Sequence, residues 1–265
     1  MRSSIAGEVL RSNTQDGVLT LTLNRPERRN AIDVALRDAL AAALDAAATD
    51  AGTHGVVLTG AGGAFCAGGD LARFEDLHDA RAYRHVSHRL TDLFASVERL
   101  EKPVVAAIDG VVTGAGLALA LACDWRIGAP TARVLFREGR VGLVPTHGGL
   151  TRLVKLVGLA RAKEALLGGD DLDAGAAHRA GLLSELAPDP ASLAAVAAAR
   201  VERMLQRAPL SFAAAKRLLA LAADADLHSS MLAESLAQTA LLQTDDHREG
   251  LAAARERREP HFKGT

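Results

Sequence analysis

Apolar residues in the first half of the chain form short runs that predict strands. Residues 17–24 (GVLTLTLN) alternate apolar and polar and are rich in Leu and Thr, as expected of a half-buried strand. Residues 55–60 (GVVLTG) and 103–110 (PVVAAIDG) are short apolar runs bounded by turn residues, which is typical of buried strands. The segments CDWRIGAP and ARVLF add two shorter strand-like pieces. This part of the chain is therefore expected to build a sheet.

Helical periodicity separates these strands and then replaces them. Apolar residues recur at helical spacing over residues 32–50, 71–100 and 151–169. From about residue 190 onward the pattern is almost entirely helical. Strand–helix units followed by helices alone predict an α/β fold, with a core over residues 1–190 and a helical C-terminal region over residues 191–265.

The composition is that of a globular chain with an aliphatic core. The 265 residues are 49% apolar but only 3% aromatic, and a formal net charge of -1 gives no field that would attract nucleic acid or a membrane. No apolar run approaches the roughly 20 residues that span a bilayer, and the first residues lack the apolar segment of a signal peptide. Cys66 and Cys123 have no metal-ligand spacing and are interpreted as buried thiols. We expect a cytoplasmic protein with no metal site, nucleic-acid partner or membrane partner.

Two glycine-rich turns are the candidate ligand-binding elements of the sequence. Residues 61–70 (AGGAFCAGGD) and 110–116 (GVVTGAG) each follow a predicted buried strand and open a predicted helix. Glycine permits a positive φ and close approach of the backbone to a ligand, and a helix N-terminus presents unpaired N–H groups. Two such N–H groups aimed at one point would form an oxyanion hole. Ordinary tight turns are the alternative, and neither loop fits the GxGxxG pattern of a dinucleotide site.

Five sequence motifs carry a resemblance to a known family. They are LTLNRPERRNAID, AFCAGGDL, KPVVAAIDGVVTGAGLALALACDWRI, EGRVGLVPTHGGLTRL and REGLAAARERREPHF, in this order across nearly the whole chain. With them the chain resembles the crotonase, or enoyl-CoA hydratase/isomerase, superfamily. The resemblance implies a crotonase-like spiral of ββα units with a helical C-terminal trimerisation region. It also implies a homotrimer, or a hexamer built as a dimer of trimers.

The resemblance assigns an acyl-CoA substrate and the residues that hold it. CoA is then part of the substrate, and no separate cofactor is expected. The oxyanion-hole N–H groups fall on Gly69 and Ala115. The positions that would contact CoA are Arg25, Arg28, Ala67, Leu71 and Arg257. Ala254 stands where the family often has an aromatic residue, which weakens the expected contact with the acyl or pantetheine chain.

The catalytic carboxylates distinguish the reactions of the family. Hydratases carry two glutamates around a bound water, and two carboxylates can divide the acid and base work. Here the first position is vacant, as Ala118, and the second is Glu138. This pattern of a single catalytic base resembles that of the Δ3,Δ2-enoyl-CoA isomerases, so we expect double-bond isomerisation. The alternatives are hydration with a substitute second acid/base and a catalytically degenerate protein that only binds acyl-CoA.

Other titratable residues have structural interpretations beside functional ones. His147, in PTHGG, stands where relatives commonly have a small residue and is the candidate second acid/base; the alternative is a turn residue or pocket liner. His85 and His88 lack the i, i+4 spacing of a helical metal pair and are interpreted as surface or lining residues. Asp70 is expected to cap the following helix, and Asp124 is expected to be structural.

Overall fold

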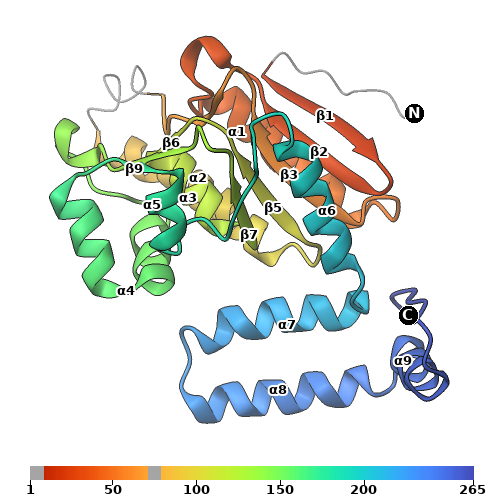
Figure 1. Ribbon diagram of the computed structural model, residues 1–265. Coiled ribbons are helices and arrows are strands. Elements are labelled where there is room, and N and C mark those ends of the chain that lie inside the picture. Colours follow the sequence, from red (N-terminus) through yellow and green to blue (C-terminus); the bar gives the residue numbers. More distant parts are fainter. Residues whose placement is uncertain (1–8, 71–78) are drawn as a thin grey trace.

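The chain folds around a six-stranded mixed sheet (Figure 1). The computed structural model describes residues 9–70 and 79–265. The sheet order is β1-β2-β3-β5-β7-β10, in which β1 and β2 are antiparallel and the remaining neighbours are parallel. Its strands are β1 (Leu10–Gln15), β2 (Val18–Leu23), β3 (Gly55–Gly60), β5 (Val104–Ile108), β7 (Trp125–Gly128) and β10 (Glu185–Leu186). The α/β class expected from the sequence is confirmed.

A second, smaller sheet carries the glycine-rich turns. Its order is β4 (Ala64–Cys66), β6 (Val111–Thr113), β8 (Arg133–Leu135) and β9 (Leu172–Asp173). Each of these strands has two or three residues, and β4 and β6 lie inside the segments that the sequence predicted as turns. The chain thus passes from a long buried strand into a short one just before each glycine loop.

Helices cover both faces of the large sheet. They are α1 (Val34–Thr49), α2 (Ala80–Arg99), α3 (Gly114–Ala122), α4 (Gly149–Gly168), α5 (Ala174–Arg179), α6 (Leu193–Leu205), α7 (Pro209–Ala222), α8 (Leu227–Leu241) and α9 (Asp245–Glu256). All five residues of β5 are buried, because alternate side chains enter two separate clusters. One cluster packs against α1, α2 and α3, and the other packs against α6. Burial on both faces explains why the sequence of β5, a parallel central strand, is a continuous apolar run.

The last three helices extend away from the body. Figure 1 shows α7 and α8 running side by side below the sheet, with α9 and the C-terminus at one end. Lys216 joins α7 to the body by donating to Asp124 Oδ2 over 2.8 Å, and Asp124 also accepts from the Val104 amide at 2.7 Å. Asp124 is therefore structural, as expected. The division of the chain at residue 190 stays a prediction, since α6 packs on β3 and β5.

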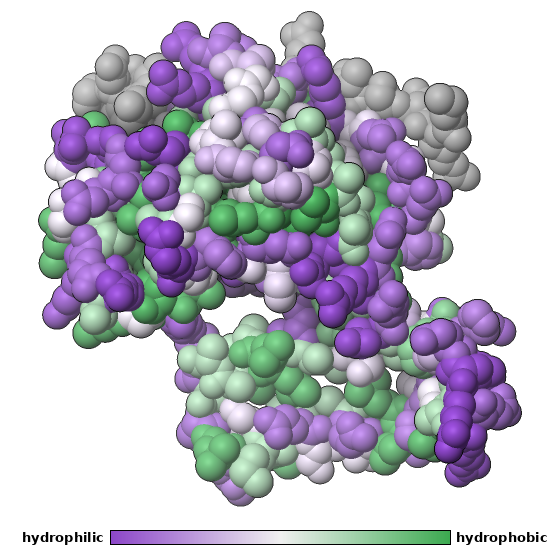
Figure 2. Space-filling view, in the orientation of Figure 1, coloured by the Kyte–Doolittle hydropathy of each residue, from purple (hydrophilic) through white to green (hydrophobic). Residues whose placement is uncertain are grey.

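Apolar side chains remain exposed on the projecting helices. Figure 2 shows them gathered over α7 and α8. The most exposed large ones are Leu219, Leu227, Met231, Leu232 and Leu236. Among the described helices, none has the length and hydropathy of a membrane-spanning segment.

Candidate active site

A buried asparagine fixes the loop in front of the first glycine turn. Asn30 accepts a hydrogen bond from the Arg25 amide at 2.8 Å and donates to the carbonyls of Ala61 and Ala64 at 2.9 and 2.7 Å. Its φ of +58° is one that Asn tolerates better than most residues. The RPERRNA loop is thereby joined to both ends of the turn that leads into β4.

The first glycine turn leaves one amide directed away from its neighbours. Gly68 has a φ of +98°. The Ile32 amide donates to the Gly68 carbonyl at 2.7 Å, and the Asp70 amide donates to the Ile32 carbonyl at 3.1 Å. This parallel bridge uses the groups on either side of the Gly69 N–H. The Gly69 amide is consequently available to a ligand on the opposite side.

The second turn presents an amide from the start of α3. Helix geometry gives the Ala115 N–H no intrahelical acceptor, and Thr113 at the N-cap makes no side-chain cap bond. A Cβ built on Gly68 would lie 3.4 Å from the Ala115 nitrogen, and one built on Gly116 would lie 2.5 Å from the Cys66 carbonyl oxygen. The two turns are therefore in direct contact, and they can approach this closely because glycine has no side chain.

Both turns open on one cavity of about 170 Å³. Gly69, Ala115 and Glu138 all line it. The remaining wall comes from Leu90 on α2 and from residues 137–147, which include the short 3-10 helix η3 (Glu138–Val141). The structure thus brings together the two candidate oxyanion donors and the candidate base.

Glu138 is placed to act on a bound molecule. It is the first residue of η3, and its Oε2 atom is buried without a hydrogen-bond partner among the described residues. The neighbouring Arg137 does not neutralise it, because Arg137 pairs with Asp171. A buried carboxylate oxygen without a donor is costly unless a ligand supplies one. This atom is accordingly the strongest chemical feature of the cavity.

His147 lies on the same wall in a constrained turn. Its φ is +56°, and its Nδ1 atom lies 3.4 Å from the hydroxyl oxygens of Ser87 and Thr91 on α2. The ring packs edge-on against Phe94, with centroids 6.0 Å apart. Burial lowers the pKa of His147 from its ordinary value of 6.5, and a hydrogen bond to the Ser87 backbone offsets part of this effect. Burial therefore favours the neutral form of the imidazole.

Ala118 is buried and does not belong to the described lining of the cavity. It is 2% exposed, and its Cβ lies 3.0 Å from the position that a Cβ on Gly149 would occupy. Position 118 is therefore filled by the contact between α3 and α4. Within the described lining of the cavity, Glu138 is the residue that supplies a carboxylate.

The residues expected to contact CoA do not all lie at the cavity. Ala67 lines the cavity. Arg25 is 14% exposed and lies 3.3 Å from Asp33 and 3.0 Å from Asp70, so its guanidinium serves intrachain ion pairs. Asp70 joins this pair, whereas the N-cap of α2 as described is Asp79. Residues 71–78, which follow Asp70, lie outside the described residues, so the expected capping role of Asp70 stays a prediction.

The other basic positions lie outside the cavity. Arg28 is exposed at the end of the short 3-10 helix η1 (Pro26–Arg28). Arg257 ends α9, which Figure 1 places far from α3 and β6. Leu71 lies outside the described residues. His85 and His88 are exposed on α2, in agreement with a surface interpretation.

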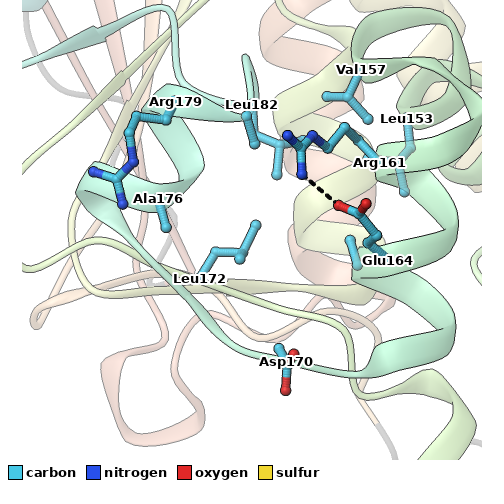
Figure 3. A pocket seen from close by; sticks show the side chains of 11 residues that line it. Leu153, Val157, Arg161, Glu164, Asp170, Leu172, Ala176, Arg179 and Leu182 are labelled. Atoms are coloured by element: carbon cyan, nitrogen blue, oxygen red, sulfur yellow. Dashed lines mark hydrogen bonds and ion pairs between the residues drawn. The ribbon is translucent and has the colours of Figure 1, made fainter.

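A larger hollow elsewhere lacks this chemistry. It measures about 390 Å³ and lies between α4, β9 and α5 (Figure 3). Its walls combine apolar residues such as Leu153 and Leu182 with charged ones, which are Asp170, Arg179 and the ion pair of Arg161 with Glu164. Neither glycine turn reaches it, so the smaller cavity is the candidate active site.

Sequence reasoning did not identify the hydroxyls that hold His147. Ser87 and Thr91 are four residues apart and so share a face of α2, which was a usable signal. Nothing in the sequence linked that face to residue 147.

Comparisons with known proteins agree with this geometry. The family model for enoyl-CoA hydratase/isomerase matches residues 13–265. The chain is 36% identical over 254 residues to a 2,3-dehydroadipyl-CoA hydratase of Escherichia coli, covering 94% of this chain and 96% of that one. It is 35% identical over 257 residues to an enoyl-CoA isomerase/hydratase of Mycosarcoma maydis, covering 94% and 93%. A crystal structure of an enoyl-CoA hydratase from Bacillus anthracis superposes with a TM-score of 0.90 at 32% identity, covering 97% of this chain and 100% of that one.

Proposed function

The chain belongs to the enoyl-CoA hydratase/isomerase family, and we propose that it moves the double bond of a 3-enoyl-CoA to the 2 position. Membership makes it a crotonase-type enzyme that acts on acyl-CoA thioesters. The observation that carries the finer proposal is the cavity itself. It combines two backbone donors with one carboxylate, while position 118 is a buried alanine outside the described lining.

The proposed reaction needs one base and one anion site. The thioester carbonyl oxygen accepts hydrogen bonds from the N–H groups of Gly69 and Ala115. Glu138 takes a proton from C2, the electrons form a dienolate, and the two amides stabilise its oxygen. Glu138 then returns the proton to C4, which leaves the double bond between C2 and C3. No water is consumed, so a second carboxylate is unnecessary.

A paired substrate assay tests this reaction. 3-Hexenoyl-CoA and crotonyl-CoA are incubated separately with the protein, and the absorbance of the conjugated enoyl thioester is followed. Isomerisation predicts a gain with 3-hexenoyl-CoA and little loss with crotonyl-CoA. Rapid loss with crotonyl-CoA would overturn the preference for isomerisation.

Hydration is the second candidate, and His147 is the observation that favours it. The Thr91 hydroxyl donates to the Ser87 carbonyl at 3.0 Å, so toward Nδ1 it offers only a lone pair. This favours a proton on Nδ1 and leaves Nε2 free to accept from a water. Glu138 and His147 would then share the acid and base work. In that case His147→Gln would abolish loss of crotonyl-CoA absorbance, whereas under isomerisation it leaves turnover of 3-hexenoyl-CoA largely intact.

Binding without turnover is the third candidate, motivated by the alanines at positions 118 and 254. It predicts saturable binding of acyl-CoA with neither absorbance change. The same samples distinguish it, because calorimetric titration with hexanoyl-CoA reports binding independently of chemistry.

We propose that Arg28 contacts the CoA nucleotide. Its exposure at the end of η1 leaves it accessible, unlike the ion-paired Arg25. Arg28→Ala is expected to raise KM for an enoyl-CoA with little change in kcat. Arg11→Ala, on the edge strand β1, is the matched control and should change neither.

The apolar surface of α7 and α8 supports assembly into a trimer or a dimer of trimers. Leu232 and Leu236 are 58% and 65% exposed in the isolated chain, and apolar surface of this extent marks an interaction site. Light scattering after size-exclusion chromatography tests the proposal. We expect a mass of three or six chains for the native protein and a smaller mass for a Leu232→Glu, Leu236→Glu variant.

A further inference from the structure

An ion pair at the active-site cavity involves the residue that directly precedes the candidate base. Arg137 lines the cavity together with Glu138. Its Nη2 atom pairs with Oδ2 of Asp171, and the two side chains are 35% and 25% exposed. The other oxygen of Asp171 is buried and has no hydrogen-bond partner among the described residues. Arg137 is therefore the group on which the Asp171 carboxylate depends.

The register of the smaller sheet brings the two residues together. β8 and β9 are antiparallel, with Val134 opposite Leu172. The chain that leaves β8 toward Arg137 therefore runs beside the chain that enters β9 from Asp171. Successive side chains of an extended segment point to opposite sides. Asp170 and Leu172 line the larger hollow (Figure 3), whereas Asp171 between them pairs with Arg137 on the active-site side.

Glu138 is the carboxylate that Arg137 would meet if Asp171 were absent. The two residues are consecutive, they line the same cavity, and Glu138 supplies the carboxylate of its described lining. A guanidinium binds a carboxylate through strong, charge-assisted hydrogen bonds. Such a bond would satisfy the buried Oε2 atom of Glu138, which has no partner among the described residues. It would also occupy the lone pair that must accept the substrate proton.

The remaining charged and titratable groups near Glu138 do not replace Asp171. Arg140, in the last turn of η3, is exposed and lies outside the described lining. His147 lies in the lining, and burial lowers its pKa, which favours the neutral form. The lining residues from α2, from α3 and from the two glycine turns carry no charge. Among the described lining residues, Arg137 is thus the cation that could neutralise Glu138.

We propose that Asp171 is a positioning residue of the active site, which holds Arg137 away from Glu138 and thereby keeps the base free to take a proton. A cation beside a carboxylate favours its ionised form, and so makes it a weaker base. A general base contributes most when its affinity for the proton suits the pH at which it works. The inference rests on the proposed function, because it takes Glu138 as the base.

Removing the two partners in turn tests this role. Asp171→Asn should lower kcat for isomerisation of 3-hexenoyl-CoA by about 10-fold or more, because Arg137 is released to Glu138. For the same reason the acidic limb of the pH–rate profile should move to lower pH by about one unit. Adding Arg137→Met to Asp171→Asn removes the released cation, and kcat should rise again by about 10-fold.

Two further variants separate charge from packing. Asp171→Glu keeps the carboxylate and should retain most of the activity. Asp170→Asn alters the adjacent carboxylate, which faces the hollow, and is the matched control that should change neither the rate nor the pH profile. Urea unfolding verifies that each variant is folded. If Asp171→Asn is not, Asp171→Ser removes the same charge with a smaller side chain and carries the same predictions.

An unchanged rate and pH profile in the folded Asp171 variant would overturn the inference. A loss of rate that Arg137→Met does not reverse would also overturn it, since that is the result of a purely structural Asp171.

A crystal structure of the Asp171→Asn variant supplies a readout that requires no turnover. We expect the Arg137 guanidinium to donate to Glu138 Oε2 over about 3 Å. An Arg137 side chain that stays away from Glu138 would overturn the inference. Formation of this pair, in a protein whose wild type turns over no 3-hexenoyl-CoA, would instead contradict the proposed reaction alone.

Discussion

Adding one methyl group at Gly116 should separate the two glycine turns that carry the proposed oxyanion donors. The new Cβ would lie 2.5 Å from the Cys66 carbonyl oxygen and 2.6 Å from the Cys66 Cβ. These contacts are too close to persist, so α3 and β4 must move apart. Such overpacking costs about 1–3 kcal/mol, while alanine gains about 1 kcal/mol over glycine within a helix. The net loss of stability is therefore small, on the order of 0–2 kcal/mol.

The loss of activity should be far larger than the loss of stability. Cys66 lies three residues before Gly69, and Gly116 directly follows Ala115, so the displacement acts on both donors. Losing one oxyanion donor costs about 10²–10³ in kcat, and we expect at least about 100-fold for Gly116→Ala. Isomerisation of 3-hexenoyl-CoA gives the rate, and urea unfolding gives the stability. Gly168→Ala, at the end of α4, is the control and should keep full activity, because among the described residues the nearest atom to its new Cβ is Asp170 Oδ2 at 3.9 Å. A folded Gly116→Ala enzyme with wild-type kcat would refute the reasoning.

Three further predictions concern charge and burial. Because burial lowers the pKa of His147 below 6.5, the folded state binds this proton less readily than the unfolded state; the free energy of unfolding should fall, relative to His147→Gln, as pH drops below about 6.5. Lys216→Met leaves Asp124 buried without its cation and should cost about 3 kcal/mol in urea unfolding, whereas Arg217→Met, in an exposed pair, should cost under about 0.5 kcal/mol. Burial raises the pKa of Cys66 to about 12, so a thiol reagent should label it only after denaturation; rapid labelling of the native protein would contradict its burial.

The fold was predictable wherever burial left a periodic signal. β5 is buried along its whole length and β3 over its first four residues, and so their apolar runs identified them. β1 was not predicted from the sequence. It is an edge strand whose six residues include one buried side chain, which leaves no alternation of apolar and polar residues to detect. β4 and β6 have three residues each, too few for any period. The φ of +77° at Gly158 interrupts α4 without changing its apolar spacing, so that kink was equally invisible.

The site was predictable in its backbone elements and less so in its charges. Glycines at the ends of strands indicated close backbone contact, and the structure shows that contact between Gly68 and the Ala115 amide. The ion pairs of Arg25 depend on Asp70, which is 45 residues away in the sequence, so only the fold could reveal them. Arg37 on α1 is 6% exposed. The sequence could not predict this burial, because a single arginine among apolar residues does not show whether its side chain reaches solvent.

The central claim is that Glu138 alone moves the proton while the two amides hold the thioester oxygen. Its most direct test is the rate of 3-hexenoyl-CoA isomerisation by Glu138→Gln, measured beside the affinity for hexanoyl-CoA. Glu164→Gln, whose carboxylate is exposed and paired with Arg161, is the matched control. The account predicts that Glu138→Gln binds hexanoyl-CoA like the wild type but loses at least about 10³ in kcat, since the shuttling group is gone. A kcat within a few-fold of the wild type would contradict the account.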